Sequence, residues 1–112
     1  MQYELIDETK IVDGVTLHRI RYCDGSQGGW IESEKNLDPD SDARVYDDAC
    51  VYGNARVYGN AHVYGYAGVF DNVCVYGTAR VYGYARVYGY AHVYGDARVY
   101  DNACVWHSQS LR

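Results

Sequence analysis

The side chains of this sequence that could carry out chemistry are its histidines and cysteines. It contains four of each, and five of these eight residues stand directly before a valine: Cys50, Cys74, Cys104, His62 and His92. Histidine and cysteine are the usual ligands of zinc, and a thiolate beside a base is the nucleophile of many enzymes. Both kinds of site require several side chains to converge on one point. The elements that hold these residues therefore decide whether they can act together.

A period of six residues organises most of the chain. Valine recurs at every sixth position from Val45 to Val105, with alanine (in one unit Val73) two residues earlier and an aromatic residue one later. In an extended segment, residues two apart point to the same side and their neighbours point to the other. Glycine, asparagine or aspartate then follows and breaks the strand, because these residues tolerate positive φ. Each hexapeptide is thus predicted to be a short strand and a corner, with alanine and valine inside.

Strands this short leave no room for crossover connections, so the chain must turn corners into a stacked coil. The unit resembles the hexapeptide repeat of left-handed β-helix proteins, which wind three hexapeptides per coil. The segment Gly28-Gly29-Trp30-Ile31-Glu32, followed by Asn36-Leu37, further resembles the YdcK-like branch, in which acyltransferases and phage-encoded proteins occur. The resemblance implies an all-β fold, a left-handed parallel β-helix.

The first forty residues follow a different pattern, which predicts a cap over the open end of the coil. Asp13-Gly14 stands between two apolar runs, as in a β-hairpin turn. We assign residues 1–28 to this hairpin cap, 29–107 to the β-helix (regular repeats 43–107) and 108–112 to a tail. Ile31 and Leu37 are interpreted as irregular first rungs, with two extra residues around Pro39. The repeat is expected to stop at Val105-Trp106.

With three units per coil, residues 18 apart stack about 4.8 Å from one another. Three aromatic ladders follow: Tyr46-Tyr64-Tyr82-Tyr100, Tyr52-Phe70-Tyr88-Trp106 and Tyr58-Tyr76-Tyr94. We expect arginine two residues before a tyrosine to cover its ring, and the ladders to stiffen the coil and to form a contact surface. The candidate interface residues are Tyr64, Tyr82, Tyr84, Tyr90, Arg80, Arg98 and Trp106.

The same coil period separates the histidines and cysteines that could carry out chemistry. His62 and His92 are predicted on different faces, and Cys50 and Cys104 on one face but about 14 Å apart, which is too far for a disulfide or a shared metal. We therefore assign no catalytic, cofactor-binding or metal-ligating residue and expect no cofactor. Free thiols fit a reducing cytosol.

The net charge of the chain indicates which kinds of partner it can bind. The formal net charge is −5, and residues 1–42 hold ten acidic against four basic side chains. An acidic chain is a poor candidate for direct binding to nucleic acid, and no apolar run is long enough for a membrane span. We expect a homo-oligomer, either an end-to-end dimer through the C-terminal edge and Trp106 or a lateral trimer, and a partner protein.

From these features we predict a non-catalytic binding or scaffold module that acts through protein–protein interaction. The resemblance to phage-encoded proteins adds the hypothesis of an inhibitor of host defence machinery in the bacterial cytoplasm. Two alternatives stay open: an acyltransferase-like hexapeptide-repeat enzyme that uses acetyl-CoA, and a nucleotide or sugar sponge. Enzymes of this fold carry a loop that bulges from a corner, whereas residues 43–105 contain no insertion.

Overall fold

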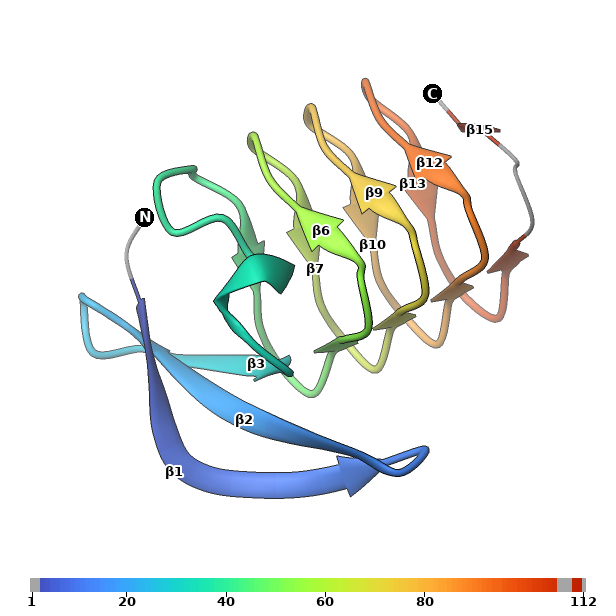
Figure 1. Cartoon of the computed structure of the whole chain (residues 1–112). Coiled ribbons are helices and arrows are strands. Elements are labelled where there is room, and N and C mark those ends of the chain that lie inside the picture. The colour runs from blue at the N-terminus through green and yellow to red at the C-terminus, as the bar shows by residue number, and fades with distance from the viewer. Residues whose placement is uncertain (1–2, 107–109, 112) are drawn as a thin grey trace.

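The computed structural model describes residues 3–106 and 110–111 and shows an all-β coil of stacked parallel strands (Figure 1). Two long strands, β1 (Tyr3–Val12) and β2 (Val15–Tyr22), precede β3 (Gln27–Ile31) and a single 3₁₀ turn, η1 (Glu34–Asn36). Two-residue strands follow at intervals of six: β4 (Arg44–Val45), β5 (Cys50–Val51), β6 (Arg56–Val57), β7 (His62–Val63), β8 (Gly68–Val69), β9 (Cys74–Val75), β10 (Arg80–Val81), β11 (Arg86–Val87), β12 (His92–Val93), β13 (Arg98–Val99), β14 (Cys104–Val105) and β15 (Ser110–Leu111).

These strands form three sheets, one on each side of the coil. Sheet A has the order β1-β2-β3-β5-β8-β11-β14, sheet B β15-β12-β9-β6, and sheet C β13-β10-β7-β4. Val45 pairs with Val63, and Val63 with Val81, so the rungs repeat every 18 residues. Three hexapeptides per coil and the parallel β-helix are thereby confirmed, while the left-handed sense remains the expectation from the resemblance.

The core consists of the alanine and valine positions that the repeat placed inside. Val45, Val63 and Val81 are all 0 % exposed, and alanines stack beside them. The corners bring the backbones of successive coils so close together that a Cβ built on Gly65 would lie 2.9 Å from the backbone nitrogen of Gly83. Gly65 also has φ = 69°, a conformation that residues with a Cβ rarely adopt. Glycine therefore meets two requirements of the corner at once.

The first coil departs from the regular spacing where the sequence indicated. Ile31 pairs with Val51, and Leu37 with Val57, both 20 residues apart instead of 18. The two additional residues lie in the segment around Pro39, between Leu37 and β4. The core is thus continuous from the first rung even though the loop above it is longer.

The N-terminal end of the coil is closed by buried polar side chains. The Tyr22 hydroxyl donates to the Val45 carbonyl oxygen (2.9 Å) and accepts from the Val45 N–H (2.7 Å), which satisfies the edge of β4. The Asn36 side chain is fully buried, and its amide nitrogen donates to the carbonyls of Gly53 and Ala55 at 3.2 and 2.9 Å. These side chains take the place of the coil that is missing above the first rung.

The β1–β2 hairpin turns at Asp13-Gly14, and its tip folds back along the outer side of sheet A (Figure 1). Leu17 packs with Trp30 and Tyr52 there, with Val12, Val15, Cys50 and Phe70 around them. The Tyr52 hydroxyl donates to the Asp13 carboxylate at 2.9 Å. The hairpin therefore covers part of an outer face as well as the end of the coil.

The C-terminal end corrects one prediction. Ser110 pairs with His92 and Leu111 with Val93, so β15 adds a rung to sheet B beyond Val105-Trp106. The expectation that the repeat ends at Val105-Trp106 was wrong. Leu111 keeps the six-residue step from Val105 without the Ala-x-Val-Tyr signature, because a rung needs only backbone N–H and C=O groups. Residues 107–109 and 112, which include His107, lie outside the described residues.

Candidate binding surface

The predicted aromatic ladders are present on the outside of all three sheets, while the place of Trp106 above Tyr88 stays a prediction. On sheet C, Tyr46, Tyr64, Tyr82 and Tyr100 stack with ring centroids 4.8–5.5 Å apart. On sheet B, Tyr58, Tyr76 and Tyr94 stack at 5.0 and 5.4 Å, and on sheet A, Tyr52, Phe70 and Tyr88 stack at 5.2 and 5.3 Å. These distances follow from the spacing of the rungs, since each ring rises from the same position of its hexapeptide.

Five of the seven candidate interface residues lie together. Tyr64, Tyr82, Arg80 and Arg98 are on the outer side of sheet C, and Tyr84 is at the corner where sheet C turns into sheet A. We call this region the sheet C surface. Tyr90 is at the corner between sheets A and B, and Trp106 follows β14 at the far end of sheet A. The last two therefore belong to other parts of the molecule.

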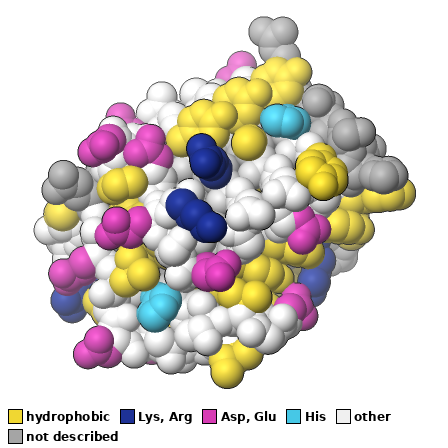
Figure 2. Space-filling model, in the orientation of Figure 1, with side chains coloured by type: hydrophobic (Ala, Val, Ile, Leu, Met, Phe, Trp, Pro, Cys, Tyr) yellow, Lys and Arg dark blue, Asp and Glu magenta, His cyan; other side chains and the backbone are white. Residues whose placement is uncertain are grey.

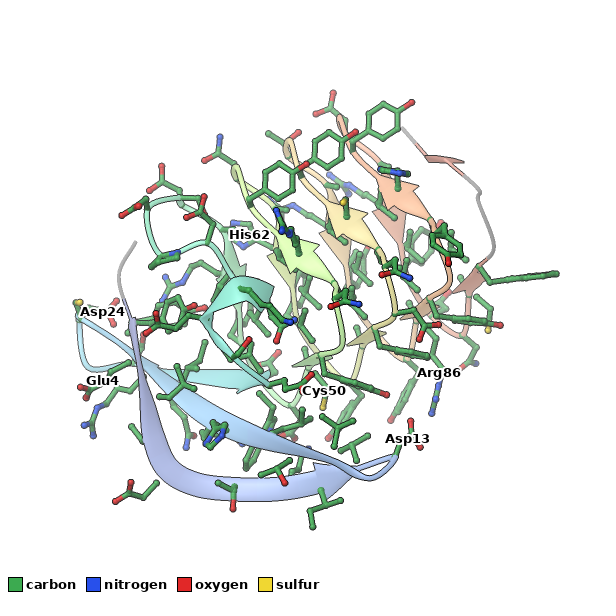
Figure 3. The ribbon with its side chains drawn as sticks, in the orientation of Figure 1. Glu4, Asp13, Asp24, Cys50, His62 and Arg86 are labelled. Atoms are coloured by element: carbon green, nitrogen blue, oxygen red, sulfur yellow. The ribbon has the colours of Figure 1, made fainter. Side chains whose placement is uncertain are left out.

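The corner beside the sheet C surface carries a second aromatic stack. Tyr66 and Tyr84 lie 5.1 Å apart with an angle of 5° between their rings, and they are 61 % and 62 % exposed. Tyr66 was absent from the candidate residues, although its 18-residue spacing from Tyr84 is visible in the sequence. Figure 3 shows the side chains projecting outward from the strands and corners.

The arginines of this surface do not cover the tyrosine rings as expected. Within residues 3–106, the cation–π contacts are those of Lys10 and Arg19 with Trp30 (4.6 and 4.8 Å) and of Arg44 with Tyr22 (4.3 Å). In the middle of a ladder each ring face is already covered by the next ring, so no face is open to a guanidinium. Arg80 and Arg98 form no ion pair or hydrogen bond with any other described residue, and they remain exposed.

The columns of stacked side chains shift the acidity of their members. Burial, followed by the charges of Arg80 and Arg44, lowers the pKa of His62. Burial raises the pKa of Tyr46 and of Tyr58, and a neighbouring tyrosine, Tyr64 or Tyr76, contributes to each rise. These surroundings favour the neutral form of His62 over the protonated form.

The fold keeps most of the histidines and cysteines apart, but it pairs Cys74 with His92 on neighbouring strands of sheet B. His62 lies on sheet C, whereas His92 and Cys74 lie on sheet B. Cys50 and Cys104 lie on sheet A, where β8 and β11 separate the strand of Cys50 from the strand of Cys104. All four cysteines are free thiols, and burial raises the pKa of Cys50. No group of three histidine, cysteine, aspartate or glutamate side chains among the described residues could hold a metal ion.

Comparison with known protein families finds a match within the repeats of the coil. The YdcK β-solenoid repeat profile matches residues 43–57, 49–65, 55–71 and 79–95. The coil is built from YdcK-like β-solenoid repeats. The matched segments of this YdcK-like solenoid contain most of the sheet C surface, including Tyr64, Tyr82 and Tyr84, whereas the hairpin lies outside them. No curated protein matches the chain.

The described part of the YdcK-like solenoid contains no helix that is long and apolar enough to cross a membrane. Figure 2 shows acidic, basic and apolar side chains interspersed over the face that it presents.

Proposed function

We propose that this YdcK-like solenoid is a non-catalytic protein-binding module and that the sheet C surface with Tyr66 contacts the partner. The observation that carries the proposal is the stacked pair Tyr66 and Tyr84, whose rings are 61 % and 62 % exposed at a corner. Tyrosine and arginine are the residues that contribute most to protein interfaces, and rings already fixed by stacking lose little side-chain entropy on binding.

The charges of the surface favour a partner with acidic groups near its contact residues. Arg80 and Arg98 are exposed and without an ion pair among the described residues, and they stand beside the Tyr64–Tyr82 stack. A carboxylate can accept two hydrogen bonds from one guanidinium. An acidic patch with an apolar centre would therefore match both components of the surface.

The experiment that tests this proposal places a photo-crosslinking amino acid at position 84, and in a control at position 60. Asn60 occupies the same place in its hexapeptide at the corner between sheets B and C, and it is exposed. In a lysate of the native host, we expect one cross-linked protein from position 84, none from position 60, and loss of the product when Tyr66→Ser and Arg80→Gln are added. Equal cross-linking from both positions would refute the proposed surface.

The finer hypotheses concern the partner and the assembly. The hypothesis that the partner belongs to host defence machinery rests on the resemblance to phage-encoded proteins. The hypothesis that the protein acts in the bacterial cytoplasm rests on the same resemblance, and the free cysteines fit a reducing compartment. A homo-oligomer through the sheet C surface or through the C-terminal edge is part of the same proposal. Light scattering separates the cases, because Trp106→Lys should dissociate an end-to-end dimer and leave a lateral oligomer intact, and a monomer at micromolar concentration would exclude both.

The acyltransferase alternative is tested by thermal denaturation with acetyl-CoA. A rise of several degrees in the melting temperature would support that alternative over the binding module.

A further inference from the structure

A groove of about 500 Å³ lies on the outer side of sheet B, away from the sheet C surface. The chain forms it where η1 and the loop at Pro39 stand next to β6 (Figure 1). Its polar and aromatic lining consists of Glu34, Lys35, Asp38, Arg56, Tyr58 and Cys74. The volume is within the range of small-molecule sites, about 300–1,000 Å³.

Tyr58 gives this groove an aromatic wall that is incomplete. Its ring stacks on Tyr76 at 5.0 Å and is the first ring of the sheet B ladder. Leu37 pairs with Val57, and the Asp38 N–H donates to the Val57 carbonyl, so Asp38 occupies the position before Tyr58 in this column. No described ring stacks on the other face of Tyr58. A planar ligand could stack there as an additional member of the ladder.

The groove also offers two cations beside this ring. Arg56 forms no ion pair or hydrogen bond with another described residue, and the Lys35 ammonium contacts only the Asn54 side-chain oxygen, at 3.4 Å. An arginine and a lysine without carboxylate partners together match the charge of a phosphate monoester, which is about −1.5 to −2 at neutral pH.

Two carboxylates complete the lining and restrict the ligand further. Asp38 accepts from the Asp40 N–H at 3.0 Å, which fixes its side chain, and Glu34 lies in η1. A carboxylate can accept hydrogen bonds from ribose hydroxyls or from the amino group of a base. Such groups would repel a ligand that carries only negative charge, so the ligand needs donors as well as an anion.

We propose that this groove binds a nucleoside monophosphate. The base stacks on the open face of Tyr58, Arg56 and Lys35 bind the phosphate, and Glu34 and Asp38 accept hydrogen bonds from the ribose or the base. The site is separate from the sheet C surface and does not depend on the protein-binding function proposed above.

The repeat supplies matched controls for the test. Calorimetric titration with AMP, GMP, CMP and UMP is carried out on the unmodified chain and on Tyr58→Ala and Arg56→Gln. Tyr94→Ala and Arg98→Gln serve as controls, because Tyr94 is a later ring of the same ladder and Arg98 occupies the same hexapeptide position on sheet C. We expect saturable binding that Tyr58→Ala weakens about tenfold, that Arg56→Gln weakens clearly, and that the controls leave within about twofold.

Further ligands test the chemical class. Inorganic phosphate and the corresponding nucleosides should each bind at least about tenfold more weakly than the nucleotide, because each lacks one of the two contacts. Free tryptophan, which has a ring and both charges but no phosphate, should also bind more weakly. If Tyr58→Ala does not fold, Lys35→Gln on the exposed turn η1 replaces it. Absence of nucleotide binding up to about 5 mM, equal affinity for tryptophan, or equal loss in the control variants would overturn the proposal.

Discussion

At the scale of single residues, the position within the hexapeptide decides how a side chain is used. Arg80 and Val81 are neighbours in β10, yet Arg80 is exposed and Val81 is 0 % exposed. The valine contacts only the apolar interior, where a charge would find neither water nor a partner.

Substitution of this pair tests the assignment of inside and outside. Val81→Asp should destabilise the fold by more than about 3 kcal/mol and abolish the cooperative melt, because it places an unpaired carboxylate in the core. Arg80→Asp should change stability by no more than about 1 kcal/mol. Circular dichroism during thermal denaturation measures both, and similar melting temperatures would contradict the arrangement.

His62 predicts a dependence of stability on pH. Its folded-state pKa is below the ordinary value of 6.5, because burial and the nearby arginines disfavour the charged ring. The stability that this group contributes is therefore present above pH 6.5 and is lost as pH falls below it, where the unfolded chain binds the proton more readily.

Urea denaturation between pH 7.5 and about 5 measures this loss. His62→Gln should reduce the loss, since glutamine does not titrate. The comparison variant is His92→Gln, which removes the histidine at the same hexapeptide position on sheet B. An unchanged pH profile for His62→Gln would show that another group causes any loss observed.

At the scale of elements, the hairpin and the coil are joined by a small outer cluster. Leu17, Trp30 and Tyr52 pack together, and the hydroxyl of Tyr52 reaches the hairpin turn at Asp13. The ladder on sheet A therefore stabilises two things at once, the stacking of its own rings and the attachment of the hairpin tip.

Tyr52→Phe should release the tip without affecting the coil. The substitution keeps the stacked ring but removes the hydrogen bond to Asp13, at a cost of about 1 kcal/mol. Hydrogen exchange at residues 10–16 should become several-fold faster, while exchange in β7–β12 stays the same. Tyr88→Phe on the same ladder is the control. Faster exchange throughout the coil would mean that the hairpin is needed for the stability of the whole chain.

At the scale of the whole molecule, each coil contacts mainly the coils before and after it, and stability is a sum of similar steps. The backbone bonds show this repetition, since the N–H of Tyr46 donates to Val63 and that of Tyr64 to Val81. A deletion that preserves the six-residue step should thus be tolerated better than a shorter deletion that disrupts this step.

Deletions test this property. Removal of residues 67–72 takes out one complete hexapeptide, so later valines still point inward and the chain should keep a cooperative melt at a lower temperature. Removal of residues 67–70 shifts the step by two and places Val75 at a corner position. That variant should lose cooperative unfolding by circular dichroism. Identical melts for the two deletions would contradict a coil built from interchangeable hexapeptides.

Much of the candidate surface was predictable from the repeat, because an 18-residue spacing places Tyr64 over Tyr82 and Arg80 over Arg98. The stacking of Tyr66 on Tyr84 follows from the same rule. Among the described residues, no arginine covers a ring of the ladders, and this was not predicted, because it depends on how closely the rings stack. The groove at Tyr58 was also missed, since Glu34 and Lys35 belong to the irregular part of the chain.

The three faces of the coil were implied by the resemblance to left-handed β-helix proteins, and the 18-residue register confirms them. The sequence by itself determined the six-residue step between Val45 and Val105 and which side chains are inside. It could do so because each unit repeats the same local choice of an alternating strand and a glycine or aspartate corner. Only the tertiary structure decided how the ends are completed: Tyr22 on the edge of β4, the hairpin tip on Tyr52, and β15 beside β12. The first two contacts occur once and join residues 23 and 39 positions apart. No period in the sequence encodes the contacts of Tyr22 and Tyr52, which depend on which side chain meets a free strand edge or an uncovered ring. The β15 rung keeps the 18-residue register but lacks the Ala-x-Val-Tyr signature that would have revealed it.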